Sequence, residues 1–308
     1  MTNLDKASLG IWEPVTLEDR DKEKIVRPSM TYWQDAWRRL KKNKLAMLGM
    51  FLIIIIFSLA IIGPMLTETN YSDQNLARGN EKTSKDHWFG TDAHGRDLLE
   101  RVLYGGRVSL TVAVVATLVQ FLIGVLYGGI SGYLGGRADN IMMRIVDIIN
   151  TIPLVLYAIL MMVVIGSGLK SVIVAIGTIY WVGMARIVRG QVLSLKEQEF
   201  ILAAKTLGAS TWRILIRHLI PNSMGPIIVT LTMMIPGAIF TESFLSFIGL
   251  GVSAPMASWG SLAADALTGL RSYPYQLFFP SAAICVTMLG FNFFGDGLRD
   301  ALDPRLRK

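Results

Sequence analysis

Long runs of apolar residues dominate the chain. The first, Leu45–Leu66, contains 22 residues without a charged side chain. A helix needs about 20 apolar residues to cross the hydrocarbon core of a bilayer. The runs lack the period-two alternation of membrane strands and are much longer than such strands. Six membrane helices are therefore predicted: Leu45–Leu66, Val108–Leu134, Ile148–Leu169, the shorter Ser171–Ala185, Pro221–Thr241 and Ser272–Gly295.

The composition agrees with this pattern. The 308 residues are 52% hydrophobic and 17% charged, whereas an ordinary soluble domain is about 25% charged. A disordered chain is also excluded, because it would be poor in large apolar residues. The single cysteine, Cys285, lies in an apolar run, which excludes a disulfide framework and a cysteine-based zinc site. The predicted fold class is all-α, a polytopic membrane protein with six transmembrane helices.

Lysine and arginine predict the orientation. With an inside N-terminus and six spans, the inside segments carry 22 of these residues and the outside segments carry 8. Cytoplasmic loops are enriched in both residue types, so an N-in/C-in topology is predicted. The formal charge of +7 is then explained without a nucleic-acid partner.

The polar segment 1–44 changes character near Thr31. Tyr32, Trp33 and Trp37 alternate there with basic residues. This pattern favours an amphipathic helix on the membrane surface, although a simple topology anchor has the same composition. The first span follows 44 residues and lacks an A-x-A cleavage site, so it is not predicted to be a signal peptide.

The predicted spans are rich in glycine and proline. Small residues let membrane helices approach closely, and proline is tolerated where neighbours satisfy the freed carbonyl group. Two explanations remain open: ordinary tight packing, or helices that bend during transport. Gly124, Gly128, Gly129 and Gly132 stripe the second span, while Pro153 interrupts the third, Pro226 and Pro236 the fifth, and Pro280 the sixth.

Catalytic patterns are absent from the sequence. There is no G-x-x-x-x-G-K-[ST] phosphate loop and no H-E-x-x-H motif, so the chain is predicted to be neither an ATPase nor another enzyme. A metal site built on His87 and His94 would need further ligands such as Asp92, and none is predicted. Asp147 and Glu242 are candidates for a translocation pathway. The alternative for Glu242 is a side chain that reaches the outer interface.

A polar segment, residues 198–222, separates the fourth and fifth spans. Glu199–Leu207 favours a helix that Gly208 breaks, and a second helix over Thr211–Leu219 is predicted to stop before Pro221. Such a pair of short helices suits docking of a soluble partner. Contact with lipid headgroups is the alternative.

One side of the first short helix is small and flat. Ala203 and Ala204 lie one turn before Leu207 and Gly208, so a partner could approach the backbone closely. The basic residues of the segment are Lys205, Arg213 and Arg217.

The segment resembles the EAA loop of ATP-binding-cassette importer permeases, whose pattern is E-A-A-x3-G-x9-I-x-L-P. Leu202, His218 and Ile220 stand where Glu, Ile and Leu are usual. Glu199, one helical turn earlier, is expected to supply the missing carboxylate. The resemblance implies ATPase coupling through Glu199, Ala203, Ala204, Leu207, Gly208, Arg213 and Pro221.

Other segments resemble the oligopeptide/dipeptide/nickel permeases in particular. The resemblance covers about residues 30–308, and Asn43–Ala46 with Pro64 is similar to the C-type subunit of these systems. Overall similarity favours the oligopeptide-transport permease of Gram-positive bacteria. The matching segments are His87–Asp97, Gly105–Leu110, Ser246–Val252, Ser258–Gly260 and Gly295–Pro304.

The resemblance implies a subunit that forms half of a peptide channel in the bacterial cytoplasmic membrane. Its implied partners are a homologous second permease, two cytoplasmic ATPase subunits, an extracytoplasmic peptide-binding protein, the peptide and membrane lipid. ATP and Mg would be bound by the ATPases, and this chain would hold no cofactor. Dipeptides or nickel chelates are alternative substrates. An ion-gradient-driven secondary transporter is the alternative from another class.

The expected organisation has four parts. Residues 1–44 form a cytoplasmic segment with a surface helix, and 45–66 form the first transmembrane helix. Residues 67–107 form an extracytoplasmic segment. Residues 108–308 form a five-helix permease core that contains the coupling loop 198–222.

Overall fold

A computed structural model describes residues 31–67 and 70–303 of the chain. These residues are helical or irregular, with no strand beyond an isolated bridge between Thr91 and Asp97. The chain separates after Asp35, and residues 36–308 are described here as one unit. The all-α prediction is confirmed.

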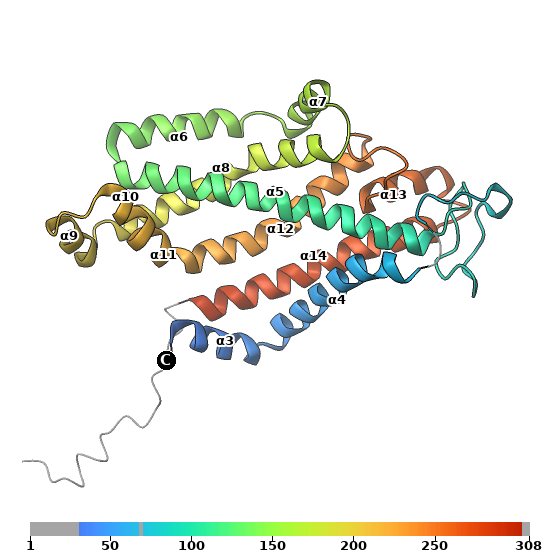
Figure 1. Ribbon diagram of the computed structural model, residues 1–308, viewed down its shortest axis with the longest axis horizontal. Coiled ribbons are helices and arrows are strands. Elements are labelled where there is room, and N and C mark those ends of the chain that lie inside the picture. Colours follow the sequence, from blue (N-terminus) through green and yellow to red (C-terminus); the bar gives the residue numbers. More distant parts are fainter. Residues whose placement is uncertain (1–30, 68–69, 304–308) are drawn as a thin grey trace, which may run out of the picture. The chain divides into compact units, whose positions relative to one another are not determined.

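The helices of the described residues are numbered as in Figure 1. They are α3 (Tyr32–Lys42), α4 (Lys44–Leu66), η2 (Leu76–Arg78), α5 (Leu98–Leu134), α6 (Gly136–Asn150), α7 (Leu154–Ile165), α8 (Leu169–Leu195), α9 (Glu199–Thr206), α10 (Thr211–Ile214), the π-helical η3 (Leu215–Leu219), α11 (Ile220–Asn222), α12 (Met224–Phe247), α13 (Trp259–Ala266), η4 (Leu267–Gly269) and α14 (Tyr275–Leu302).

Five helices of the described residues are long and apolar enough to cross a membrane: α4, α5, α8, α12 and α14. The pair α6 and α7 makes a sixth candidate, but it bends by 85° at a short break. The predicted interruption of the third span at Pro153 is confirmed, and it takes the form of a sharp bend between two helices. The break ends at Pro153, which lacks an N–H donor and disfavours helical geometry in the residue before it.

The other prolines do not interrupt their helices. Pro236 and Pro280 lie inside the continuous helices α12 and α14, and Pro226 lies in the first turn of α12. Proline costs little in a first turn because the N–H groups there have no helical partner. In α4, Pro64 leaves the carbonyl of Ala60 without a helical donor, and the guanidinium of Arg107 donates to that carbonyl at 3.3 Å.

The fourth span continues well past Arg186, where it was predicted to end. Arg186 donates to Asp147 at 3.0 Å, and Arg189 donates to both carboxylate oxygens of Asp139 at 2.6 Å. Both aspartates lie on α6. The partner helix thus supplies the charges that let α8 carry arginines in its last turns.

Three of the four stripe glycines of α5 pack directly against α8. A Cβ atom on Gly124 would lie 2.6 Å from the Cβ of Met184, and one on Gly132 would lie 2.8 Å from the carbonyl oxygen of Arg189. Between them, a Cβ on Gly128 would overlap the backbone of Ala185. The two backbones therefore touch, and α5 and α8 run side by side in Figure 1. Of the two explanations for these glycines, tight packing is what the structure displays.

The helices define two ends of the unit 36–308. At one end, α8 leads into α9, α10 and α11, and this is called the α9 end. At the other end, α13 lies near the segment 70–97 that precedes α5 (Figure 1). The helix α12 runs between them, since it begins directly after α11 and contacts α13.

The α5–α8 contact predicts the effect of one methyl group. We expect Gly128→Ala to lower the melting temperature of the purified protein in detergent, because overpacking typically costs about 1–3 kcal/mol. Gly183→Ala on α8 is the matched control, since nothing lies within 4 Å of a Cβ at Gly183. Equal melting temperatures of the two variants would contradict the packing argument.

Candidate functional site

The segment 198–222, called the docking segment, is anchored by buried apolar side chains. Ile201 of α9, Ile214 of α10, and Leu215 and Leu219 of η3 are at most 1% exposed. They pack in one cluster with Val125 of α5, Met184, Val188 and Val192 of α8, and Ile227 of α12. The docking segment is therefore packed against three long helices.

The outer surface of the docking segment carries large apolar side chains among polar ones. Leu207 is 87% exposed and Trp212 is 58% exposed. Between them, Gly208 has φ +78°, a conformation that L side chains rarely adopt. Clusters of exposed apolar side chains of this kind mark contact surfaces. Phe200, Leu202 and Ile216 are exposed as well.

The helices of this segment follow the predicted order with one difference. The break at Gly208 is confirmed, but the second helix does not stop before Pro221. Instead, it passes through the π-helical turn η3, where the N–H of Ile220 donates to the carbonyl of Leu215, and continues as α11. The shifted hydrogen-bond register accommodates a residue without an N–H donor.

The predicted coupling residues lie on the surface of the docking segment. Ala204 is half-buried and the other six are exposed. The small side of α9 is thus open to a partner in the part of the chain that the structure describes. The exposed six are Glu199, Ala203, Leu207, Gly208, Arg213 and Pro221.

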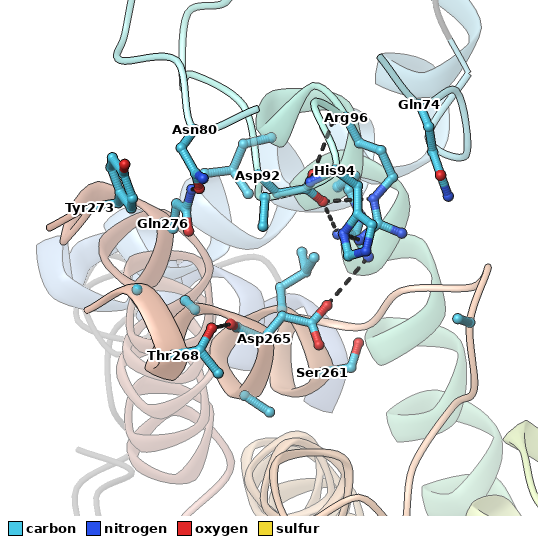
Figure 2. Close-up of a pocket in the computed structure, with 18 of the residues that line it drawn as sticks. Gln74, Asn80, Asp92, His94, Arg96, Ser261, Asp265, Thr268, Tyr273 and Gln276 are labelled. Carbon is cyan, nitrogen blue, oxygen red and sulfur yellow. Dashed lines mark hydrogen bonds and ion pairs between the residues drawn. The ribbon is translucent and has the colours of Figure 1, made fainter. Parts of the chain in front are cut away.

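A pocket of about 750 Å³ lies at the α13 end. Figure 2 shows Asp92, His94 and Arg96 from the segment before α5 facing Ser261 and Asp265 of α13. The pocket is lined by both polar and apolar side chains.

One wall of the pocket is a buried ion cluster centred on Asp92. One carboxylate oxygen accepts hydrogen bonds from Arg96 Nε at 2.6 Å and Arg101 Nη1 at 2.5 Å. The other accepts from the backbone N–H groups of His94 and Arg96. Burial opposes ionisation of Asp92, but the hydrogen bonds from Arg96 and the charge of Arg101 outweigh it, so the pKa of Asp92 is lowered. Asp265 lies 3.6 Å from Arg101 and is largely exposed.

The two histidines of this region contact charged side chains. His87 Nδ1 lies 2.7 Å from Asp97 Oδ2, and Asp97 also caps the N-terminus of α5. His94 Nδ1 lies 3.4 Å from a nitrogen of Arg96. The described residues contain no group of three side chains arranged for a metal ion.

The two pathway candidates have different environments. Asp147 is about half exposed and pairs with Arg186. Glu242 is 1% exposed and accepts hydrogen bonds from the hydroxyls of Ser109 and Ser246, each at 2.7 Å. The alternative in which the Glu242 side chain reaches the outer interface is therefore wrong. A role of either residue in translocation stays a prediction.

Sequence reasoning missed the ion cluster around Asp92 and the serine hydroxyl groups around Glu242. The spacing of Asp92 and Arg96 was a usable signal, because a tight turn through Gly95, which has positive φ, brings the two residues together. The link between Ser109 and Glu242 joins residues 133 positions apart, and no local pattern predicts it.

Comparison with known proteins identifies the family. Residues 124–308 match the family described as "Binding-protein-dependent transport system inner membrane component". The chain belongs to this family. Residues 31–82 match a second family, the N-terminal transmembrane domain of oligopeptide transport permease C. The resemblance inferred from the docking segment is confirmed, and the protein is a multi-pass membrane protein.

Relatives of this permease include peptide-transport subunits. The oligopeptide transport system permease protein OppC of Bacillus subtilis is 52% identical, covering 100% of both chains. The dipeptide transport system permease protein DppC of the same organism is 54% identical over 94% of this chain and 91% of the relative. OppC of Escherichia coli K12 is 45% identical over 92% of this chain and 95% of the relative.

The fold is also similar to a solved ABC transporter chain. A chain of the MetNI methionine ABC transporter in an inward-facing conformation superposes with a TM-score of 0.53 and 17% identity. The match covers 66% of this permease and 96% of that chain. At this identity the likeness concerns the fold alone.

The cluster around Asp92 predicts a dependence on charge and pH. Because its pKa is lowered, its stabilising effect is present above the ordinary aspartate pKa of about 3.9 and is lost as pH falls through the folded-state pKa. Asp92→Asn should mimic this loss at neutral pH, since removing one partner of a buried ion pair costs about 3–5 kcal/mol. We expect faster amide hydrogen exchange over residues 87–97 in the variant.

The control for this variant is Asp86→Asn. Asp86 has an exposed side chain and lies 3.6 Å from Arg78, so its loss should leave the exchange rates unchanged. Unaltered protection of residues 87–97 in Asp92→Asn would show that the cluster does not stabilise this region.

Proposed function

We propose that this permease forms half of the channel of an ATP-binding-cassette importer for oligopeptides and is driven by partner ATPases through the docking segment. The observation that carries the proposal is the construction of that segment. Its inner side is locked by buried side chains to α5, α8 and α12, and its outer side offers exposed apolar residues. A surface built in this way can receive a force and pass it to the membrane helices.

In the proposed orientation, the α9 end faces the cytoplasm. The excess of lysine and arginine on that side supports it. The α13 end, with the pocket and the segment 70–97, then faces the outside. The proposed partners follow from the family: a second permease, two ATPases that bind ATP and Mg, and a peptide-binding protein on the outside.

Oligopeptides are the proposed cargo, with dipeptides as the second candidate. Full-length similarity to OppC and the match of residues 31–82 to the permease C domain favour oligopeptides. The 54% identity to a dipeptide permease keeps the second candidate open.

The proposed mechanism is alternating access. Closure of the ATPase dimer on ATP would move the docking segment, and α5, α8 and α12 would follow because they share its apolar core. Energy would enter here because exposed apolar side chains gather on this segment at the α9 end. Hydrolysis would then return the channel to its inward-open state.

An ion-gradient-driven transporter is the alternative from another class. It requires titratable groups that reach a passage. Asp147 is already paired with Arg186, and Glu242 is enclosed by hydroxyl groups. These contacts favour a drive supplied by partner subunits.

Replacing Gly208 tests the coupling role. We expect Gly208→Leu to insert and fold but to uncouple peptide uptake from ATP hydrolysis in proteoliposomes that contain all subunits. The φ of +78° disfavours an L side chain, while no atom of this chain lies within 4 Å of its Cβ position. The Cβ of the new side chain therefore clashes with no atom of this chain, and the side chain is proposed to meet the docked partner.

The matched control is Gly249→Leu, at the α13 end. Gly249 has φ +84° and equally open space, so it shares the backbone cost without facing the ATPases. Normal coupling in Gly208→Leu would contradict the assignment of the docking segment.

A transport assay tests the driving force and the cargo together. In proteoliposomes with all subunits, we expect uptake of labelled peptides longer than two residues to require ATP and to persist when an ionophore abolishes ion gradients. Uptake without the ATPase subunits would favour the ion-driven alternative. Preference for dipeptides or a nickel chelate would correct the cargo.

A further inference from the structure

A junction of three helices at the α13 end is centred on Glu242. This residue lies near the end of α12, and its carboxylate is 2.7 Å from the hydroxyl of Ser109 on α5. The same Ser109 oxygen accepts a hydrogen bond at 3.2 Å from the backbone N–H of Trp259, the first residue of α13. One hydroxyl group therefore links α12 to α13.

Close backbone contacts leave this junction little freedom. The indole N–H of Trp259 donates to the carbonyl of Val102 on α5 at 2.9 Å. A Cβ on Gly106 of α5 would lie 2.8 Å from the Trp259 ring. A Cβ on Gly260 would lie 2.5 Å from the Cα of Ser243 on α12. A shift of α12 here must therefore either carry α5 and α13 along or break the hydrogen bonds.

Burial makes breaking these hydrogen bonds costly. Ser109 is fully buried and Glu242 is 1% exposed. No ion pair of Glu242 is found among the described residues. Its partners are hydroxyl groups from α5 and α12, together with that of Ser258, the N-cap of α13. A buried carboxylate that loses a donor is left unsatisfied in a medium of low dielectric constant. Moving together is therefore the favoured response.

The two ends of this chain of contacts are the docking segment and the pocket. Ile227, in the first turns of α12, is fully buried in the apolar cluster of the docking segment. At the other end, α13 contributes Ser261, Leu262 and Asp265 to the lining of the 750 Å³ pocket. A continuous helix thus joins the cluster to the junction.

We propose that Ser109 and Glu242 are positioning residues that link movement of the docking segment to the shape of the α13-end pocket. The helix α12 would carry the movement from the docking segment to the junction. The hydrogen bonds of Ser109 with Glu242 and with Trp259 would pass the movement on to α13. This inference rests on the proposed function, because ATP binding by partner subunits supplies the movement.

The test measures the pocket in two nucleotide states. Ala264 of α13 lines the pocket and is half-buried. In a Cys285→Ser background, Ala264→Cys provides the only cysteine of this chain. The rate at which a membrane-impermeant maleimide labels this chain, separated from the other subunits by electrophoresis, then reports the pocket. Labelling is compared between the nucleotide-free transporter and the transporter trapped with ATP and vanadate, both in proteoliposomes with all subunits.

Two serine variants form a matched pair. Ser109 and Ser246 are both buried and both donate to Glu242 at 2.7 Å, but Ser246 lies on α12 itself and does not bridge helices. Couplings between sites are typically worth about 5- to 150-fold. We expect Ser109→Ala to reduce the state-dependent change in labelling rate at least about fivefold, with Ser246→Ala close to the parent. Glu242→Ala should behave like Ser109→Ala.

Three outcomes would overturn the inference. Equal state-dependent changes in Ser109→Ala and Ser246→Ala would show that bridging is irrelevant. An unchanged labelling rate in a parent that takes up peptide with ATP would remove the link to the pocket but leave the proposed function intact. A parent without ATP-dependent uptake would remove the proposed function and the inference with it. Should Glu242→Ala fail to assemble, the serine pair alone decides.

Discussion

The backbone contact between α5 and α8 is the constraint on which the rest of the structure depends. Membrane helices gain little from burying apolar surface against each other, because lipid is equally apolar. Close packing has to hold them, and Gly124, Gly128 and Gly132 permit it by presenting no side chain to α8. The α5–α8 pair then forms the wall against which the docking segment packs. It also aligns α6, whose Asp139 meets Arg189 beside the last of these glycines.

The α9 end and the α13 end of the unit 36–308 differ in the kind of side chain that they bury and expose. At the α9 end, the docking segment buries one apolar side against the long helices and leaves another exposed. That arrangement suits a contact surface that stays packed against its own chain while it binds and releases a partner. At the α13 end, polar groups are buried and therefore have to find hydrogen-bond partners. Asp92 with its two arginines and Glu242 with its serines meet this requirement in two ways.

Much of the fold could be predicted because the bilayer sets simple local rules. Five apolar runs became helices near their predicted places, and Gly208 ended α9 because of its positive φ. Partner-dependent features could not be predicted. The helix α8 passes Arg186 because α6 supplies Asp147, and α5 starts at Leu98 because Asp97 caps it. Of the prolines, Pro153 alone breaks a predicted span.

The sequence by itself determined the fold class, the order of the helices and the family, since each depends on composition or on motifs that are contiguous in the chain. Only the tertiary structure decided which buried polar groups meet. Ser109 and Glu242 lie 133 positions apart, and no local signal connects them, because the contact exists only once α5, α12 and α13 have packed together. Low-dielectric surroundings make such a contact costly to break, and for this reason the proposed connection between the two ends runs through it.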